Sequence, residues 1–341
     1  MRARASWLSS CGSCSAKRPA PFRALRWFSI TQTGKGAGFT ASMVIAAIVN
    51  PAAGNGRSEA RWARVERLLD RSGVTVRAVR SEGPGHAEQL VGELLKRRPA
   101  AIIAAGGDGT FHEVVNGLYA AGNGDATVPL GLVYAGTGMD LSRNLRMSRA
   151  TESTAQRILS GRSARVDLGA CETTTRRRVF VNFGETGIGA AVVAREASMH
   201  SHLPGRLSFL FAALHACAAS QPVDGRVLVD GACLYAGRLL SVVAANGRFF
   251  GGGMKIAPVA NMADGLLDVV VLGDFSRPEL FTQIWKIYPG LHVEHPQVFT
   301  ARGSTVSIQL SRPTQLDLDG ELYEDRFHSF QILPGALRVL V

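Results

Sequence analysis

The sequence is poor in several features that define common protein classes. It has only five cysteines among 341 residues, at irregular spacings, and charged residues make up 19%. A disulfide framework is therefore not expected, because such frameworks occur in short, cysteine-dense chains. No apolar run reaches the ~18 residues of a membrane-spanning helix. The longest candidate, residues 207–219, is shorter and contains His215.

The composition is otherwise that of a globular protein. Hydrophobic residues make up 46%, which excludes disorder as the main state. The 38 glycines follow no three-residue period, which excludes a collagen-like chain. A chain of this length is sufficient for two domains of about 150 residues each.

The net charge of +11 comes mostly from an acid-free tail at the amino end. The tail contains seven basic residues: Arg2, Arg4, Lys17, Arg18, Arg23, Arg26 and Lys35. The rest of the chain has 31 basic and 27 acidic residues and is thus nearly balanced. We find no nucleic-acid-binding motif, so no nucleic-acid partner is expected.

Residues 1–42 are expected to be a basic, disordered tail or a mistaken start. An organelle transit peptide, an arm attracted to anionic lipid, and an upstream start ahead of Met43 all fit this composition. Cys11 and Cys14 have the spacing of a metal or redox pair. No second pair or nearby histidine completes such a site, so we interpret them as incidental thiols.

From Val44 onward, strand and helix patterns alternate. Apolar runs and helix-period segments predict strands at 44–49, 75–79, 100–105 and 128–134 with helices between them. Alternation of this kind predicts a doubly wound α/β domain with a parallel sheet.

After about Val166 the pattern changes to mainly antiparallel β structure. Strands are predicted at 178–183, 227–229, 233–245, 266–271, 305–310 and 315–318. Asp230-Gly231 predicts a hairpin turn between two of them. Helices are predicted at 207–219 and 278–287.

Three glycine-bearing loops follow strands of the first half: 50–56, 106–110 and 136–140. Ligands of parallel sheets collect at the carboxyl ends of the strands, and glycines there permit close approach of phosphate. The sequence has no P-loop, no full Gly-x-Gly-x-x-Gly and no Gly-x-Ser-x-Gly elbow. His112-Glu113 begins a zinc-protease motif, but Asn116 stands at the second histidine position.

Together these motifs resemble the diacylglycerol kinase catalytic domain, and more closely the soluble bacterial lipid kinases of that superfamily. The resemblance extends from Met43 to Val341. It rests on an ordered set of motifs: Asn50-Pro51, Gly83-Pro84-Gly85-His86-Ala87, Gly107-Asp108-Gly109-Thr110, Gly136-Thr137-Gly138-x-Asp140, Asn246 with Gly251-Gly252-Gly253, Ala263-Asp264-Gly265-Leu266-Leu267-Asp268, and Asp319-Gly320-Glu321.

The resemblance implies an α/β ATP-binding domain at 43–165 and a β-sandwich domain at 166–325, with the active-site cleft between them. A C-terminal segment at 326–341 is expected to pack back on the first domain. The family's ATP contacts fall here on Asn50, Ser81, Gly107, Asp108, Gly109, Thr110, Phe111, His112, Glu113 and Thr137.

The resemblance also implies two magnesium sites. Asp108 and Asp140 would hold the catalytic Mg²⁺, partly through water, and neutralise charge on the transferred phosphoryl group. Asp264 would hold a structural Mg²⁺ with the backbone carbonyls of Asn261 and Leu266.

Glu321 admits two interpretations from the sequence. A strand would place Asp317, Asp319 and Glu321 on one face, as an acidic solvated surface. Alternatively, Asp319-Gly320 turns the chain and Glu321 projects from it. The resemblance makes Glu321 the general base that accepts the proton of the lipid hydroxyl.

Two positions depart from the family pattern, because Met139 and His112 both stand where Asn is frequent. A histidine at 112 is also compatible with a plain helix-surface residue. The apolar segment 203–219 would line an acyl-chain groove or belong to the core.

We therefore expect an ATP- and Mg²⁺-dependent enzyme that phosphorylates a diacylglycerol-like lipid at a membrane surface. It would be cytoplasmic and peripherally membrane-associated, with a role in phospholipid biosynthesis. A sphingoid-base or other lipid-alcohol kinase, an NAD kinase, and a nucleotide- or lipid-binding module without activity are the alternatives. Formation of a homodimer is left open.

Overall fold

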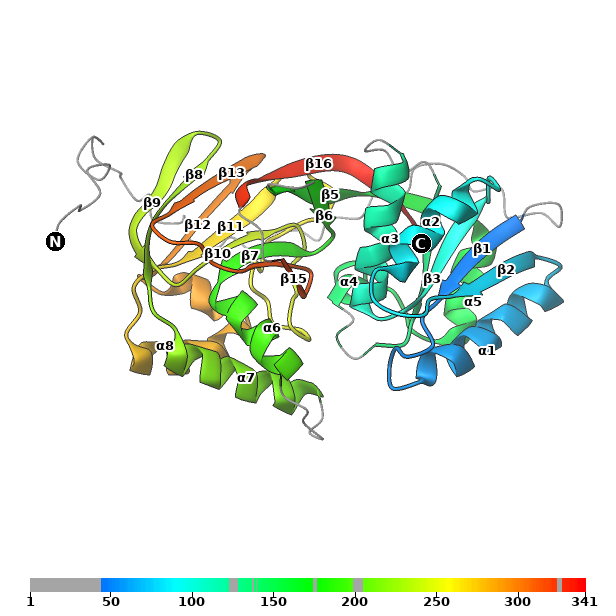
Figure 1. Cartoon of the computed structure of the whole chain (residues 1–341), viewed down its shortest axis with the longest axis horizontal. Helices are drawn as coiled ribbons and strands as arrows, with labels where there is room; N and C mark the ends of the chain where they lie inside the picture. Colours follow the sequence, from blue (N-terminus) through cyan, green and yellow to red (C-terminus); the bar gives the residue numbers. More distant parts are fainter. Residues whose placement is uncertain are drawn as a thin grey trace.

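The computed structural model describes residues 44–122, 128–136, 138, 140–173, 177–198, 205–323 and 327–341. The basic tail, Thr137 and Met139 lie outside these residues. In the described part of the chain, no helix is both long enough and apolar enough to cross a membrane. The chain forms two lobes that lie side by side (Figure 1).

The first lobe is built on a parallel sheet. Its strands lie in the order β2 (Thr75–Arg80), β1 (Val44–Val49), β3 (Ala101–Gly106) and β4 (Leu130–Tyr134). β1 pairs in parallel with β2 and β3, and β3 pairs in parallel with β4. β3 and β4 are buried along their whole length, as expected of strands covered on both faces.

Helices cover both faces of this sheet. The first lobe contains α1 (Arg57–Arg71), α2 (His86–Leu95), α3 (Asp108–Ala121), α4 (Asp140–Asn144) and α5 (Thr151–Ser160). Trp62, Val65 and Leu69 recur at helical spacing along α1 and are completely buried. They form one core with α5 residues, whereas α2 and α3 form a second core on the opposite face.

The second lobe is a β-sandwich. The parallel sheet continues through β16, β13, β8 and β9, with β5 paired to β16 and β6 paired to β5. A separate sheet has the order β12-β11-β10-β7-β14-β15. The strands are β5 (Ser163–Thr173), β6 (Arg177–Phe180), β7 (Phe183–Gly187), β8 (Val223–Val229), β9 (Ala232–Leu239), β10 (Ser241–Ala245), β11 (Leu267–Leu272), β12 (Val298–Gly303), β13 (Thr305–Leu310), β14 (Leu316–Leu318), β15 (Glu321–Tyr323) and β16 (Phe327–Leu340). The rings of Phe180 and Phe330 meet edge to face inside the sandwich.

A helical layer covers the outer face of the six-stranded sheet (Figure 1). It consists of α6 (Ile188–Ser198), α7 (Gly205–Ala219), α8 (Arg277–Ile287) and the 3-10 helix η2 (Leu291–Glu294). Val243 and Val270 of the sheet pack in one core with Leu280 and Ile284 of α8. The second lobe therefore has three layers, with helices on one side only.

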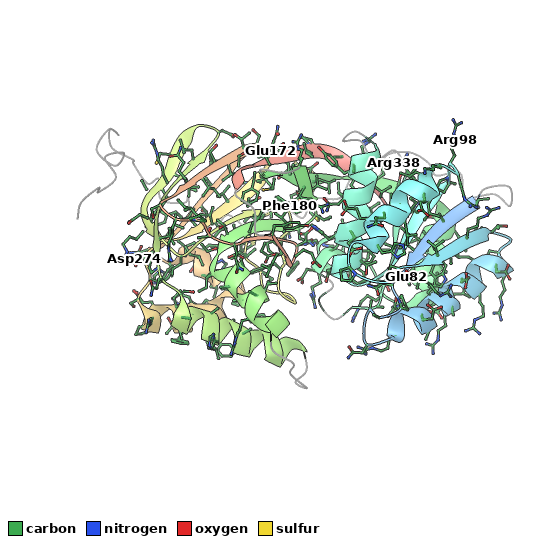
Figure 2. All side chains as sticks on the ribbon, viewed as in Figure 1. Glu82, Arg98, Glu172, Phe180, Asp274 and Arg338 are labelled. Carbon is green, nitrogen blue, oxygen red and sulfur yellow. The ribbon has the colours of Figure 1, made fainter. Side chains whose placement is uncertain are left out.

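Two long strands connect the lobes. β5 and β16 pair antiparallel, and the end of β16 joins the first lobe, where Val339 lies opposite Leu130 of β4 in a parallel pair. Figure 1 shows both strands crossing the upper side of the molecule, and Figure 2 shows Glu172 of β5 and Arg338 of β16 along that edge. One continuous sheet thus holds the two lobes in place.

The predicted fold class is confirmed, with two local corrections. The expected strand 233–245 is two strands, because the chain passes from the ten-stranded to the six-stranded sheet at Leu240. The expected strand 178–183 is interrupted between β6 and β7. The Asp230-Gly231 hairpin is confirmed: β8 and β9 pair antiparallel, and both turn residues have positive φ.

Candidate active site

Three loops of the first lobe meet at one edge of the parallel sheet. They follow β1, β3 and β4, as the sequence predicted. Asn50 Nδ2 donates a hydrogen bond of 3.0 Å to Thr110 Oγ1, which ties the first loop to the second. A Cβ on Gly136 would stand 2.8 Å from the Cα of Gly107. Glycine at this position therefore lets the second and third loops touch.

Asp108 is the first residue of α3 and lies where these loops meet. Tyr134 donates a hydrogen bond from its hydroxyl to Asp108 Oδ1. Asp108 Oδ2 faces the third loop, 2.5 Å from the position that a Cβ on Gly138 would take. Burial, and then the charge of Asp108, raise the pKa of Tyr134 well above its ordinary value, so the phenol remains a donor.

Asp140 begins α4 on the third loop and is almost completely buried. Arg143 Nη1 donates to Asp140 Oδ1 at 2.6 Å, and the Gly252 N–H donates to Oδ2 at 2.9 Å. Burial raises the pKa of Asp140 to about 6; the Gly252 N–H opposes this shift, and the nearby charge of Asp108 adds to it. The two acids are thus close enough to repel each other, which is an arrangement that a cation would stabilise.

Glu321 reaches this site from the second lobe. It opens β15, and its Oε1 lies 2.6 Å from the position that a Cβ on Gly109 would occupy. The residue keeps contact with solvent, but partial burial of its carboxylate raises its pKa, with the charge of His112 opposing the shift and that of Glu113 adding to it. The carboxylate therefore lies at the first turn of α3, beside Gly109.

The turn before Glu321 is fixed by Asp319. β14 and β15 pair antiparallel, and both Asp319 and Gly320 have positive φ, so the chain turns here rather than continuing as one strand. The Asp319 carboxylate accepts hydrogen bonds of 2.6, 2.8 and 3.0 Å from the N–H groups of residues 181–183. These bonds satisfy the backbone N–H groups at the interruption between β6 and β7. Of the two interpretations of Glu321, the structure therefore supports the one in which Asp319-Gly320 turns the chain.

Three predicted nucleotide contacts have their side chains directed elsewhere. Phe111 is buried in the first lobe's core, where its ring packs edge to face on Tyr134. His112 is buried, not a surface residue: its Nε2 lies 2.8 Å from the Tyr323 hydroxyl. Glu113 accepts hydrogen bonds from the N–H groups of Gly85 and Ala87, at the start of α2. Contacts of these three side chains with a nucleotide are therefore not supported; the first turn of α3 remains the candidate.

Ser81 and Thr137 complete the predicted nucleotide set. Ser81 is buried at the end of β2, where its N–H donates a hydrogen bond of 2.9 Å to the Val49 carbonyl. It thus lies at the same sheet edge as Asn50. Thr137 is outside the described residues, and its contact stays a prediction.

Asp264 lies away from this cluster, in the loop before β11. It accepts a hydrogen bond from the Leu266 N–H and pairs with Arg302. Arg302 also lies 3.3 Å from Asp268 Oδ1. The other oxygen of Asp268 is buried without a hydrogen-bond partner, and burial raises the pKa of Asp268 to about 6. Arg302 thus provides the positive charge beside the predicted structural metal site.

A cavity of about 310 Å³ extends from the acidic cluster into the second lobe. Asp108, Asp140 and Asp319 line one part of it. The larger part lies between the six-stranded sheet and the helical layer, and its lining is mainly apolar, including Phe183, Ile188, Val192, Ala213, Val243, Met254, Ile256, Phe275, Leu280, Ile284, Ile287 and Val298. This volume is within the range of small-ligand sites. Ala213 and Cys217 of α7 are among the lining residues, so this segment contributes to the groove as well as to the core.

A second pair of acids, which was not predicted from the sequence, lies in this cavity. Glu185 of β7 and Asp317 of β14 lie directly opposite each other in the sheet, and both are buried. Glu185 Oε1 accepts hydrogen bonds of 2.7 Å from Ser241 Oγ and from the N–H of Gly189, in the first turn of α6. Burial raises the pKa of both acids. Their signal in the sequence is weak, because a single acid in an apolar run gives no indication of its cross-strand partner.

The donor chemistry at both predicted metal sites fits magnesium. Asp108 and Asp140 provide carboxylate oxygens at one sheet edge, and Asp268 provides a buried carboxylate oxygen without a partner near Asp264. Mg²⁺ prefers such oxygen ligands and retains several waters. In the described part of the chain, no cluster of three or more His, Cys, Asp or Glu side chains could hold a metal by itself. Water, backbone carbonyls or substrate phosphate must therefore complete either site.

Comparison with known families agrees with this architecture. Residues 44–171 match the model of the diacylglycerol kinase catalytic domain, and residues 184–341 match that of the YegS C-terminal NAD kinase beta sandwich-like domain. A Pseudomonas fluorescens protein named "Probable lipid kinase YegS-like" is 32% identical over 256 residues, which are 75% of this chain and 82% of that protein. The chain belongs to this family of lipid kinases.

Two further proteins are similar to the chain over most of its length. The diacylglycerol kinase of Mycobacterium tuberculosis is 29% identical over 300 residues, covering 87% of this chain and 94% of the relative. A crystal structure of a diacylglycerol kinase from Bacillus anthracis superposes with a TM-score of 0.65 at 19% identity, over 87% of this chain and 96% of that one. The predicted family and fold are thus confirmed for this lipid kinase, across both lobes.

Proposed function

We propose that this lipid kinase transfers the γ-phosphate of ATP to a hydroxyl group of a diacylglycerol-like lipid, with Mg²⁺. The observation that carries the proposal is the cavity, because a single space joins the carboxylates of Asp108 and Asp140 to a long apolar lining. A lipid alcohol has the matching shape: a polar hydroxyl end that undergoes the chemistry and hydrocarbon chains that need an apolar site.

Nucleotide binding is supported by the edge of the parallel sheet. The loops at Asn50, Gly107 and Gly136 lie together there, and α3 begins among them. N–H groups at a helix N-terminus attract phosphate, and glycines let it approach the backbone. We assign the phosphate groups of ATP to the first turn of α3, Gly107 to Thr110.

Asp108 and Asp140 would hold the catalytic Mg²⁺, with Asp264 and the carbonyls of Asn261 and Leu266 at the structural site. The catalytic ion would neutralise charge on the transferred phosphoryl group. Within the chain, Tyr134 and Arg143 orient the two acids: Tyr134 holds Asp108 by its hydroxyl, and Arg143 holds Asp140 at 2.6 Å. These contacts keep both carboxylates ready for a cation.

We assign to Glu321 the role of general base. Its carboxylate would accept the proton of the lipid hydroxyl as the hydroxyl oxygen forms a bond to the γ-phosphorus. The bond from that phosphorus to the bridging oxygen breaks, and ADP leaves. Three features support this role: the carboxylate lies beside the first turn of α3, it comes from the lobe that contains the cavity, and its pKa is raised.

The test is transfer of radiolabelled γ-phosphate from ATP to a panel of acceptors in mixed micelles, with and without Mg²⁺. Diacylglycerol, sphingosine and NAD represent the competing classes. Metal-dependent labelling of diacylglycerol is expected. Labelling of sphingosine would change the acceptor class and keep the mechanism, whereas labelling of NAD alone would overturn the proposal. ATP binding without transfer to any lipid would favour a binding module.

A further inference from the structure

Among the residues whose burial the structure describes, the exposed large hydrophobic side chains all lie between residues 281 and 291. They are Trp285, Leu291 and Phe281, with 59%, 50% and 37% of their surface accessible. Phe281 and Trp285 belong to α8, and Leu291 is the first residue of η2, directly after it. Exposed apolar groups scattered singly are ordinary, but a local group of this kind marks a binding surface. We call these three residues the α8 patch.

Helix α8 has apolar residues on its exposed side as well as on its buried side. Phe281 and Trp285 are four residues apart and therefore lie on one side of α8. Leu280 and Ile284 lie on the other side, are buried and belong to the second lobe's outer core. The sequence thus places aromatic residues on the side that core packing does not use.

The buried side of α8 forms a wall of the cavity. Leu280, Ile284 and Ile287 line it, together with Phe275 just before the helix. The same cavity reaches the catalytic carboxylates at its other part. Helix α8 therefore separates the exposed apolar patch from the apolar space assigned to the lipid chains.

The polar residues around the patch suit a lipid headgroup region. Arg277 and Lys286 are exposed on the same helix. Glu279 accepts hydrogen bonds from the Ser276 N–H and hydroxyl at 2.8 and 2.6 Å, so its charge is held at the start of α8. Trp is enriched where an apolar phase meets water, and long basic side chains extend from that boundary into the headgroups.

A second copy of the chain is a poorer fit to the patch. Large aromatic side chains bury roughly 150–250 Å² each when fully covered. Three partly exposed side chains therefore provide well below the ~800 Å² per partner of a stable protein interface. A bilayer needs no such area, because shallow insertion of a few side chains is sufficient for reversible binding.

We propose that the α8 patch docks this lipid kinase on the surface of a lipid bilayer, so that acyl chains enter the cavity past α8 while the hydroxyl reaches Asp108 and Glu321. The inference rests on the proposed function for the identity of the occupant. It goes further in assigning the membrane contact to three named residues.

The test uses the full chain and a triple variant, Phe281→Ala, Trp285→Ala and Leu291→Ser. Because all three side chains are exposed, the variant should fold normally, which circular dichroism checks. Glu93→Ala, at an exposed position on α2 of the other lobe, is the matched control. Binding is measured by co-sedimentation with phosphatidylcholine vesicles containing diacylglycerol, and again with phosphatidylglycerol added.

The triple variant should bind vesicles about tenfold or more weakly than the wild type does. The control variant Glu93→Ala should bind them as the wild type does. Phosphorylation of long-chain diacylglycerol in vesicles should fall in parallel, while phosphorylation of monomeric dioctanoylglycerol should stay unchanged. Vesicle binding should shift tryptophan fluorescence to the blue, and the shift should be smaller in the triple variant, which lacks Trp285 but keeps Trp7, Trp27 and the fully buried Trp62.

Equal vesicle binding by wild type and triple variant would overturn the inference. So would a wild-type dimer that the triple substitution converts to a monomer, because the patch would then be an interface between copies. Wild-type vesicle binding through the patch with no lipid labelled would reject the proposed function and leave the surface standing. Labelling of both long- and short-chain lipids, unaffected by the substitutions, would reject the surface and leave the function standing.

Discussion

Glu321 Oε1 lies so close to Gly109 that a Cβ on the glycine would stand 2.6 Å from it. The two residues come from different lobes, and real Cβ atoms do not approach an oxygen so closely. Gly109 is helical, so nothing about its backbone requires glycine. Its lack of a side chain therefore serves the Glu321 carboxylate.

Gly109→Ala tests this relationship. The added methyl should displace Glu321 and lower kcat by about tenfold or more, whereas the helix itself should not suffer, because Ala is the better helix former. Gly92→Ala in α2 is the matched control, since a Cβ there meets nothing within 4 Å. Steady-state kinetics measure kcat of both variants, and thermal unfolding measures their stability. Full activity of Gly109→Ala would mean that Glu321 is free to move without consequence.

Glu321→Gln tests the general base directly. We expect ATP binding to persist and phosphoryl transfer to slow by about 10²-fold or more. Because partial burial raises the pKa of Glu321, the wild type should lose activity, as the pH falls, at a higher pH than it would with an ordinary glutamate. A pH profile of kcat in wild type and variant measures this loss of activity at low pH. If the profile of the variant kept the same acid limb, another group would be the base.

Asp108→Asn should abolish turnover and leave the fold intact. The amide retains the size of the side chain and still accepts a hydrogen bond from Tyr134, but the negative charge beside Asp140 is lost. Transfer assays together with circular dichroism measure both properties. Tyr134→Phe serves as the comparison, since it retains the carboxylate and should reduce activity only modestly. Near-normal turnover of Asp108→Asn would exclude the proposed magnesium role.

Asp319→Ala should destabilise the protein. Its buried carboxylate accepts three backbone hydrogen bonds from residues 181–183, and alanine would leave those donors without partners. An unsatisfied buried donor costs about 1–3 kcal/mol, so a loss of about 3 kcal/mol or more is expected in urea unfolding. Asp317→Asn, two residues away, retains its acceptor for the Gly320 N–H and should cost less. Equal midpoints for the Asp319 variant and wild type would contradict this account.

His292 should make stability depend on pH. Burial lowers its pKa to about 4 in the folded state, against 6.5 when unfolded, and the Ile256 carbonyl opposes the shift. Between these values the unfolded chain binds more protons, so stability should fall as the pH drops from 6.5 to 4, by up to ~1.4 kcal/mol per pH unit. His292→Gln should flatten this slope relative to wild type. Denaturant unfolding at several pH values measures it, and parallel slopes would assign the dependence to other groups.

Much of the fold could be predicted because its signals are local. The wholly apolar strand 44–49 and the helical spacing of Trp62, Val65 and Leu69 both follow from which faces are buried. Cys233–Ala245 could not be divided, because a change of sheet at Leu240 depends on partners far away in the chain. The turn at Asp319 was left open for the same reason: its anchors are the N–H groups of residues 181–183.

The sequence alone determined the family of this protein, its order of domains and the acids at its sheet edge. These depend on motifs that are continuous along the chain, and on glycine loops whose chemistry is fixed by the missing side chain. The tertiary structure decided that His112 is buried, that Glu321 lies over Gly109, and that α8 has one side in the cavity and Trp285 on the other. Such contacts join segments tens to hundreds of residues apart, and they are set by packing of the whole molecule rather than by any local pattern.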